Sequence, residues 1–392
     1  MKTILIVDDE IPILKSLMRL FIDSKIEALT AENGLDALEI IKNHKIDLVI
    51  SDMRMPLMDG YEFLSQVKKE YPEIIRVILS GYSEEKTIFR ALLHNIAHLY
   101  LFKPWNNAEL IRSIEQLLET ADILSSADLL VLFNNLEGLP TIPSVYQEIL
   151  EMIDSDADIL DVAAAIEKDP SISTRLLHVA NSAFSDLHTG SVKQAAIHVG
   201  LPNIRSLICS TSVLDLGAPE GTERILAERL WKHSLLTSKL LHFLYDEVLQ
   251  KKMPEAAYSA GLLHNIGLLL LLHGHHLKLT KMIQNAWTED IHFLDYERAE
   301  FGVTHQEVGG YLAQWWGLPF PIVEVALYHH RPLESGIINA ELVYAVHIAQ
   351  HYAWILMGEP VVAEFFPDTF GRLGLSSTQF ENLVKDRSWF EA

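Results

Sequence analysis

Hydrophobic positions in the first 120 residues fall into two alternating patterns. Short apolar runs, typical of buried parallel strands, occupy residues 3–7, 26–30, 46–50, 74–79 and 99–102. Stretches with apolar residues three and four positions apart follow at residues 12–21, 34–42, 61–69, 84–93 and 106–119. Because strands and helices alternate five times, the pattern predicts an α/β domain with a doubly wound five-stranded parallel sheet over residues 1–120.

The remainder of the chain shows helical spacing almost throughout. From Ser144 onward, segments such as VYQEILEMI, ILDVAAAIEKD and ISTRLLHVANSAF are separated by short turn sequences. Apolar spacing also continues across residues 121–137, where no Gly-, Ser- or Pro-rich spacer occurs. We therefore expect a helical connector at 121–137, followed by an all-α helical domain.

Charge is distributed unevenly over the 392 residues. The net charge is −22; residues 1–120 carry 14 Lys and Arg against 19 Asp and Glu, a balance of −5, which leaves −17 for the rest. Since nucleic-acid binding normally requires a basic face, the acidic second part argues against a nucleic-acid partner. The one cysteine, Cys209, excludes an internal disulfide and indicates a reducing compartment.

Membrane insertion is not expected from the sequence. The N-terminus MKTILIVDDE lacks the basic region, apolar core and cleavage site of a secretory signal. The apolar stretch from Gly261 to Leu272 is shorter than a membrane span. A cytoplasmic protein without a membrane partner is therefore expected.

Chemically active side chains follow four of the five predicted strands. Asp8 and Asp9 follow the first strand, Asp52 the third, Ser80 the fourth and Lys103 the fifth. Converging carboxylates repel one another unless a hard cation such as Mg²⁺ lies among them, and a lysine with a hydroxyl can bind phosphoryl oxygens. The pattern indicates phosphoryl transfer to Asp52 as nucleophile. The alternative is that Asp8 and Asp9 cap the first helix and Lys103 is a surface charge.

Four ordered motifs in this region, VDDE, SDMRMPLMDG, LSGYS and YLFKP, resemble the receiver domain of two-component response regulators, a flavodoxin-like fold. The resemblance covers residues 1–120. It implies that Asp52 accepts a phosphoryl group from a histidine kinase. It also implies that Asp8, Asp9, Asp52 and the backbone carbonyl of Arg54 hold Mg²⁺.

The same resemblance assigns roles on the fourth and fifth strands. Ser80 and Lys103 would bind the phosphoryl oxygens, and Tyr100 stands where the family has its switch aromatic. The added negative charge would then bias a two-state packing arrangement. Tyr100 as an ordinary core aromatic remains the alternative.

Histidine is concentrated in the second part, where fifteen of the eighteen residues lie. The sequence LLLLLHGHH favours a polar helix end around Gly274, and the pair His329-His330 is another candidate for metal binding or for a structural role. The pair His264-Asn265 is more informative, because an adjacent His-Asp on a helix can chelate a divalent metal. Asn265 is neutral, so it would balance cation charge poorly.

Six ordered blocks, LPTIPSVYQEIL, IEKDPSISTRLLHVANSAF, AAIHVGLPNIRSLI, LWKHSLLTSKLL, AYSAGLLHNIGLLLL and HQEVGGYLAQWWGLP, resemble the HDOD domain. This family is a degenerate, all-helical relative of the HD phosphohydrolases. The resemblance predicts an HDOD domain at 138–335, with helices at 336–392 completing or extending its bundle.

Mapping the HD metal set onto this sequence leaves it incomplete. His233 and His264 match the two histidines, whereas Asn265 and Gln350 stand where the family has carboxylates. The Gly-Tyr-Pro motif of related phosphodiesterases is absent from the sequence. We therefore expect a degenerate, non-catalytic site and no cofactor in the HDOD domain.

The leading hypothesis is a response regulator in which phosphorylation alters a non-catalytic output domain. That domain would bind downstream signalling proteins or self-associate, for example as a phosphorylation-dependent homodimer. The alternative is a metal-dependent HD-type phosphohydrolase or cyclic-dinucleotide phosphodiesterase regulated by the receiver. A third hypothesis is a cleft that binds a nucleotide without cleaving it.

Overall fold

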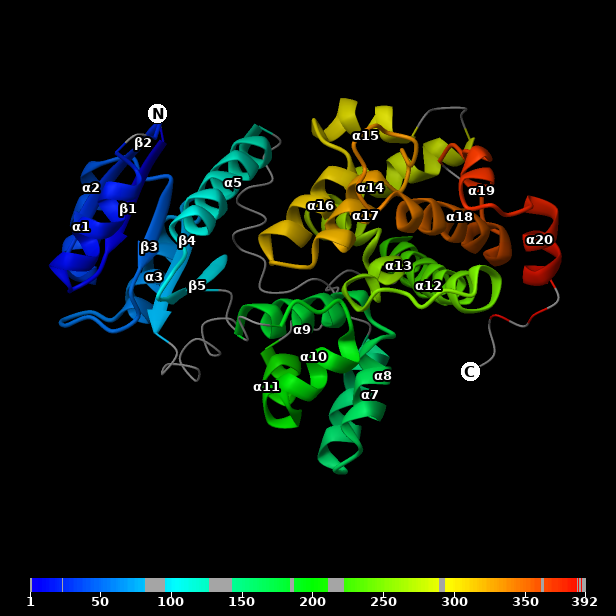
Figure 1. The fold of residues 1–392 in the computed structure, drawn as a ribbon, viewed down its shortest axis with the longest axis horizontal. Helices are drawn as coiled ribbons and strands as arrows, with labels where there is room; N and C mark the ends of the chain where they lie inside the picture. The colour runs from blue at the N-terminus through cyan, green and yellow to red at the C-terminus, as the bar shows by residue number, and fades with distance from the viewer. Residues whose placement is uncertain are drawn as a thin grey trace. The chain divides into compact units, whose positions relative to one another are not determined.

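The computed structural model describes residues 2–22, 24–81, 96–126, 143–183, 187–210, 222–288, 293–360, 363–385, 387 and 389 (Figure 1). The chain divides into two compact units, the first built mainly from residues 1–137 and the second mainly from residues 138–392. The predicted helix at 84–93 and most of the predicted connector lie outside the described residues.

The first unit contains the five-stranded parallel sheet that the sequence predicts. Its strands lie in the order β2-β1-β3-β4-β5, and each neighbouring pair is parallel. The strands are β1 (Lys2–Val7), β2 (Ile26–Ala31), β3 (Leu48–Ser51), β4 (Ile75–Gly81) and β5 (Leu99–Lys103). Because side chains from both faces of β1 and β3 are buried, these strands have continuous apolar runs rather than alternating ones.

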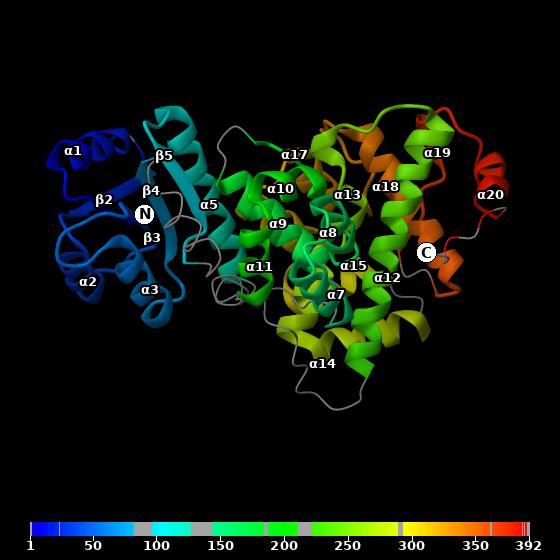
Figure 2. The same ribbon diagram turned by 90° about the horizontal axis from the view of Figure 1, so that it is seen from below.

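Helices cover both faces of this sheet, with α1 and α5 on one side and α2 and α3 on the other (Figure 2). The helices are α1 (Ile11–Leu20), α2 (Gly34–Asn43), α3 (Gly60–Glu70) and α5 (Asn107–Ser126). The side chains of Asn33 and Asp59 accept backbone N–H groups and cap the starts of α2 and α3.

Helix α5 is longer than its sequence pattern predicts. It has 20 residues and continues seven positions beyond the expected end at Glu119. Leu110, Ile114 and Leu117 are buried along its length, and the Lys2 ammonium forms an ion pair with Asp122 near its end. The first part of the predicted connector is therefore a continuation of this receiver helix.

The described part of the second unit consists of helices (Figure 1). The α-helices are α7 (Pro143–Asp154), α8 (Ile159–Ile166), α9 (Pro170–Ala183), α10 (Val192–Val199), α11 (Leu201–Ser210), α12 (Thr222–Phe243), α13 (Ala260–Leu263), α14 (Ile266–Thr288), α15 (Phe293–Phe301), α16 (His305–Trp315), α17 (Phe320–Tyr328), α18 (Ala340–Met357), α19 (Asp368–Arg372) and α20 (Ser377–Lys385). A π-helix (Leu244–Leu249) follows α12, and a short 3₁₀ helix (Glu255–Ala257) precedes α13. The predicted α/β domain followed by an all-α domain is thus confirmed.

Helix α14 is interrupted where the sequence favours a helix end. His275, next to Gly274, has a non-helical backbone (φ −138°, ψ 40°), and a second helical segment follows it directly and runs to Thr288. Leu279 and Met282 beyond the kink are buried, so apolar packing supports the helix past its polar segment. The segment Glu255–Leu272 is apolar and long enough to cross a membrane, yet 83% of it is buried within the protein, as in a core helix.

Two glycines bring α14 close to α16. A Cβ added at Gly267 would lie 2.0 Å from the His305 backbone oxygen and 2.6 Å from the Gly309 nitrogen. The two backbones therefore approach at a distance that only a residue without a side chain permits. This crossing fixes the start of α16, where His305 lies.

Candidate functional site

The carboxyl ends of β1, β3 and β5 bring three charged side chains together. The Lys103 ammonium lies 2.5 Å from Asp52 Oδ1 and 2.8 Å from Asp8 Oδ2. Asp8 and Asp52 are 1% and 8% exposed, whereas the neighbouring Asp9 is exposed. The structure thus places Lys103 between two buried carboxylates, with a third carboxylate on the solvent side.

Backbone donors fix the orientation of both buried carboxylates. The Glu10 N–H donates to Asp8 Oδ1 at 2.9 Å, and the Arg54 N–H donates to Asp52 Oδ2 at 2.6 Å. The loop after Asp52 then turns back against it, since a Cβ at Gly60 would lie 2.0 Å from the Asp52 carbonyl oxygen. The Arg54 backbone donor and the close approach of the loop at Gly60 therefore fix the position of Asp52 at the strand end.

Burial and ion pairing act in opposite directions on these groups. Burial raises the pKa of the Asp8 carboxyl, although hydrogen bonds from Lys103 and the Glu10 backbone act to lower it. Burial acts to lower the pKa of Lys103, but its hydrogen bonds and charge interactions with Asp52 and Asp8 outweigh this, so that the pKa is raised. Lys103 therefore stays protonated at neutral pH.

The remaining predicted receiver residues lie on the adjoining strands. Ser80 of β4 pairs with Phe102 of β5, but its side chain lies outside the described residues. Tyr100 of β5 is buried, and burial raises the pKa of its hydroxyl. A buried aromatic at this position fits both a core role and one state of a switch, so its switching role stays a prediction.

Replacing Lys103 with Met is expected to make stability depend on pH. Without the ammonium, the pKa of Asp8 rises further above its value in the unfolded chain. The ionised carboxyl then destabilises the fold at neutral pH, and this loss of folding free energy disappears when acidification protonates Asp8. We expect about 2 kcal/mol of destabilisation at pH 8 without Mg²⁺, and a smaller loss at pH 5. Urea midpoints at the two pH values measure this, and an equal loss at both would contradict it.

The four residues of the predicted HD-type set meet in the interior of the second unit. His233 lies on α12, His264 and Asn265 lie between α13 and α14, Gln350 lies on α18, and all four are buried. His233 Nε2 donates to the Gln350 backbone carbonyl at 2.9 Å, and the Asn265 amide lies 3.4 Å from His233 Nδ1. Both ring nitrogens of His233 therefore have protein partners in the described structure.

These imidazoles lie in an environment that favours their neutral form. Burial lowers the pKa of His233 to about 3 and holds the pKa of His264 well below its usual value. Trp354 stacks on His233 with ring centroids 3.9 Å apart. His233 is thus a packed and hydrogen-bonded residue in the described structure.

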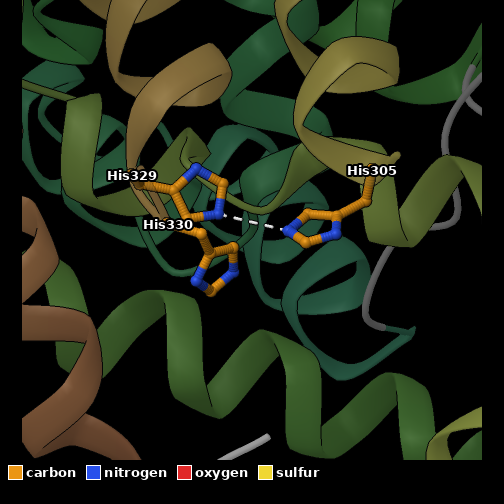
Figure 3. A group of neighbouring side chains, drawn as sticks. All are labelled: His305, His329 and His330. Atoms are coloured by element: carbon orange, nitrogen blue, oxygen red, sulfur yellow. Dashed lines mark hydrogen bonds between the residues drawn. The ribbon is translucent and has the colours of Figure 1, made fainter. Parts of the chain in front are cut away.

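A second group of histidines lies beside this set and is shown in Figure 3. One ring nitrogen from each of His305, His329 and His330 lies within 4.8 Å of the others, and all three residues are buried. Glu297 of α15 accepts from His305 Nδ1 at 2.7 Å. Sequence reasoning singled out His329-His330 but missed His305 and Glu297, because no regular spacing links two helices to the turn that follows a third.

Two protein families match this chain in succession. Residues 4–115 match the response regulator receiver domain, and residues 139–332 match the HDOD domain. The first range contains the Asp52 site. The second contains the His305, His329 and His330 cluster and the HD-type set, apart from Gln350 of that set. The order agrees with the resemblances drawn from the sequence motifs.

Curated relatives match parts of the chain. The hydrogenase transcriptional regulatory protein HoxA of Cupriavidus necator is 32% identical over 117 residues, which is 30% of this chain and 24% of that protein. An uncharacterized protein of Treponema pallidum is 27% identical over 225 residues, 56% of this chain and 42% of that protein. The chain therefore spans less than half the length of each of these relatives.

Solved structures resemble parts of the chain. The signal receiver domain of an HD domain-containing protein from Pseudomonas fluorescens is 32% identical, covering 31% of this chain and 97% of that one, with a TM-score of 0.30. The MmoQ response regulator of Methylococcus capsulatus is 23% identical and shares the fold over 64% of this chain and 99% of that one, with a TM-score of 0.50. The chain belongs to the response regulators, with an N-terminal receiver domain followed by an HDOD domain.

Proposed function

We propose that Asp52 accepts a phosphoryl group from a histidine kinase and that this modification alters a non-catalytic HDOD output in the cytoplasm. The single observation that supports the acceptor role best is the position of the Lys103 ammonium, 2.5 Å from Asp52 and 2.8 Å from Asp8. A fixed cation beside a strand-end carboxylate suits the charge that develops during phosphoryl transfer.

The chemistry assigns a role to each side chain at the sheet edge. An Asp52 oxygen forms the new O–P bond as the N–P bond of the kinase phosphohistidine breaks, and the released imidazole takes up a proton. Lys103 and the Ser80 hydroxyl then bind phosphoryl oxygens, so that Lys103 exchanges the Asp52 carboxylate for the phosphoryl group.

The carboxylates also fit the magnesium ion that receiver domains use. Two buried acidic side chains and the exposed Asp9 provide the hard oxygen ligands that Mg²⁺ prefers. Asp8, Asp9, Asp52 and the backbone carbonyl of Arg54 would hold it. When bound, Mg²⁺ neutralises charge on the transferred group.

The output proposal rests on the neutral residues of the HD-type set. Asn265 and Gln350 stand where an active HD enzyme has carboxylates, and both His233 nitrogens already have protein partners. A partner protein or a second copy of the chain is therefore the proposed target of the HDOD domain. The competing enzyme hypothesis requires phosphodiester hydrolysis that depends on His233 and His264.

Acetyl phosphate provides a direct test of this proposal. Incubating the full chain with it and Mg²⁺ is expected to add about one phosphoryl group and to change the oligomeric state or the protease sensitivity around residues 120–140. Intact mass, light scattering and timed proteolysis measure these changes. A chain that stays unmodified with Mg²⁺, or that is modified equally with a chelator present, would contradict the acceptor assignment.

A further inference from the structure

We propose that His305, His329 and His330 form a zinc-binding site, directly beside the degenerate set at His233 and His264. The observation behind it is the cluster of ring nitrogens, one from each residue, all within 4.8 Å of one another (Figure 3). Three neutral imidazoles without a carboxylate ligand suit zinc rather than Mg²⁺ or Ca²⁺. This inference departs from the sequence-based expectation that the HDOD domain holds no metal.

Hydrogen bonds outside the cluster orient two of the rings. His329 Nδ1 lies 3.1 Å from the Val325 carbonyl oxygen and 3.0 Å from that of Ala326. Since a carbonyl only accepts, His329 carries its proton on Nδ1, and its Nε2 presents a lone pair. His305 Nδ1 faces the Glu297 carboxylate at 2.7 Å, so its Nε2 also presents a lone pair when it donates there.

The two lone pairs face one another across a short gap. His305 Nε2 lies 3.2 Å from His329 Nε2, inside a fully buried environment. Two lone pairs at this distance repel each other unless a cation lies between the rings. Two imidazole ligands on a tetrahedral zinc ion are about 3.3 Å apart for zinc–nitrogen bonds of about 2.0–2.1 Å, which agrees with the observed separation.

A buried carboxylate and a small cavity adjoin the cluster. Glu297 is fully buried and also accepts from the His305 backbone N–H at 2.9 Å, so it fixes the ring as carboxylates do behind metal-binding histidines. A cavity of about 20 Å³, enough for about one water molecule, is lined by His330 and Asn265. His330 is the member of the cluster that lines this cavity, so a water there could serve as the fourth ligand of a three-histidine zinc site.

Several buried polar atoms around the cluster lack a hydrogen-bond partner in the described structure, among them the His264 Nε2 and the Gln350 side-chain oxygen. His264 donates from Nδ1 to the Gly261 carbonyl at 2.7 Å, which leaves its Nε2 unpartnered beside the cluster. The Gln350 side chain lies 3.2 Å from His330 Nδ1, and its oxygen is also unpartnered. Rotating this amide would let Gln350 accept from His330 Nδ1 and free the His330 Nε2 for zinc.

The test uses the full chain, purified without a histidine tag, stripped with a chelator and titrated with Zn²⁺ or Co²⁺. We expect about one equivalent bound, with the visible absorption of tetrahedral cobalt. His305→Ala and His329→Ala should weaken binding by at least about 100-fold, and Glu297→Gln, which keeps the side-chain shape, by about 10–100-fold. His351→Ala, which removes a ring stacked on Phe365 away from the cluster, should leave zinc binding unchanged.

Receiver carboxylates could also bind zinc, so the titration is repeated with Asp9→Asn and Asp52→Asn combined. Unchanged zinc binding in this variant supports the histidine site whether or not Asp52 is a phosphoacceptor. Circular dichroism checks that each variant is folded. If an alanine variant unfolds, the zinc affinity of Glu297→Gln and the cobalt spectrum of the wild-type protein decide whether the histidine site binds the metal. Folded wild-type protein that binds neither metal would overturn the proposal, because a shared proton would then bridge His305 and His329.

Discussion

Asp52→Asn is expected to abolish labelling by acetyl phosphate in the presence of Mg²⁺. The amide has no anionic oxygen with which to attack phosphorus, and it removes one charge next to Lys103, whose ammonium lies 2.5 Å from Asp52 Oδ1. Loss of the nucleophile should lower labelling by at least about 1,000-fold, below detection by intact mass.

Asp47→Asn is the matched control for this variant. Asp47 precedes β3 at the opposite end from Asp52, and its Oδ2 accepts from the Thr3 backbone N–H at 2.8 Å. An asparagine retains an acceptor oxygen there, so labelling should remain at the wild-type level. If Asp52→Asn is labelled at the wild-type rate, the phosphoryl acceptor is another residue.

Gly267→Ala is expected to destabilise the helical domain strongly. The new methyl group would lie 2.0 Å from the His305 backbone oxygen, and backbone atoms cannot move aside as a flexible side chain can. Helices α14 and α16 must therefore separate. Forced overpacking of this kind costs about 3 kcal/mol, which lowers the melting temperature of a domain of this size by roughly 6–12 °C.

Gly371→Ala provides the control for Gly267→Ala. Gly371 lies in α19, and an added Cβ would meet nothing within 4 Å. The substitution should be neutral or should stabilise by up to about 1 kcal/mol, because alanine restricts the unfolded chain. Calorimetry of both variants measures the difference, and equal melting temperatures would show that the α14–α16 crossing tolerates a side chain.

Most of the receiver fold could be predicted from the sequence, because its determinants are local. Continuous apolar runs specify strands buried on both faces, and the alternation with amphipathic helices specifies a parallel sheet. The carboxyl ends of neighbouring strands then meet, which is why Asp8, Asp52 and Lys103 could be placed together from their order alone. The structure adds the salt-bridge distances and the orientation of each carboxylate.

The helical domain was less predictable in detail. The expected helix end around Gly274 corresponds to the non-helical backbone at His275, but the local pattern did not show that a second helical segment follows at once. Later apolar residues of that segment, including Leu279, pack in the core, and such tertiary packing is not encoded in the local sequence preference.

The histidine cluster illustrates a different limit. His305, His329 and Glu297 approach one another only after α15, α16 and α17 have packed, and no periodicity in the sequence encodes those distances. By contrast, His233, His264, Asn265 and Gln350 could be grouped because a family pattern already relates them. Sequence reasoning therefore identified the HD-type set but missed His305 of the neighbouring histidine cluster.

Because α5 is long, a small tilt at its first turn produces a larger displacement at its last turn. A helix of 20 residues is about 30 Å long, so a rotation of about 5° about its first turn would displace its last turn by roughly 2.6 Å. Leu110, Ile114 and Leu117 are buried along the helix, so a change in the packing beneath them would tilt it. A sub-ångström displacement near the start of α5 would thus become a displacement several times larger at Ser126.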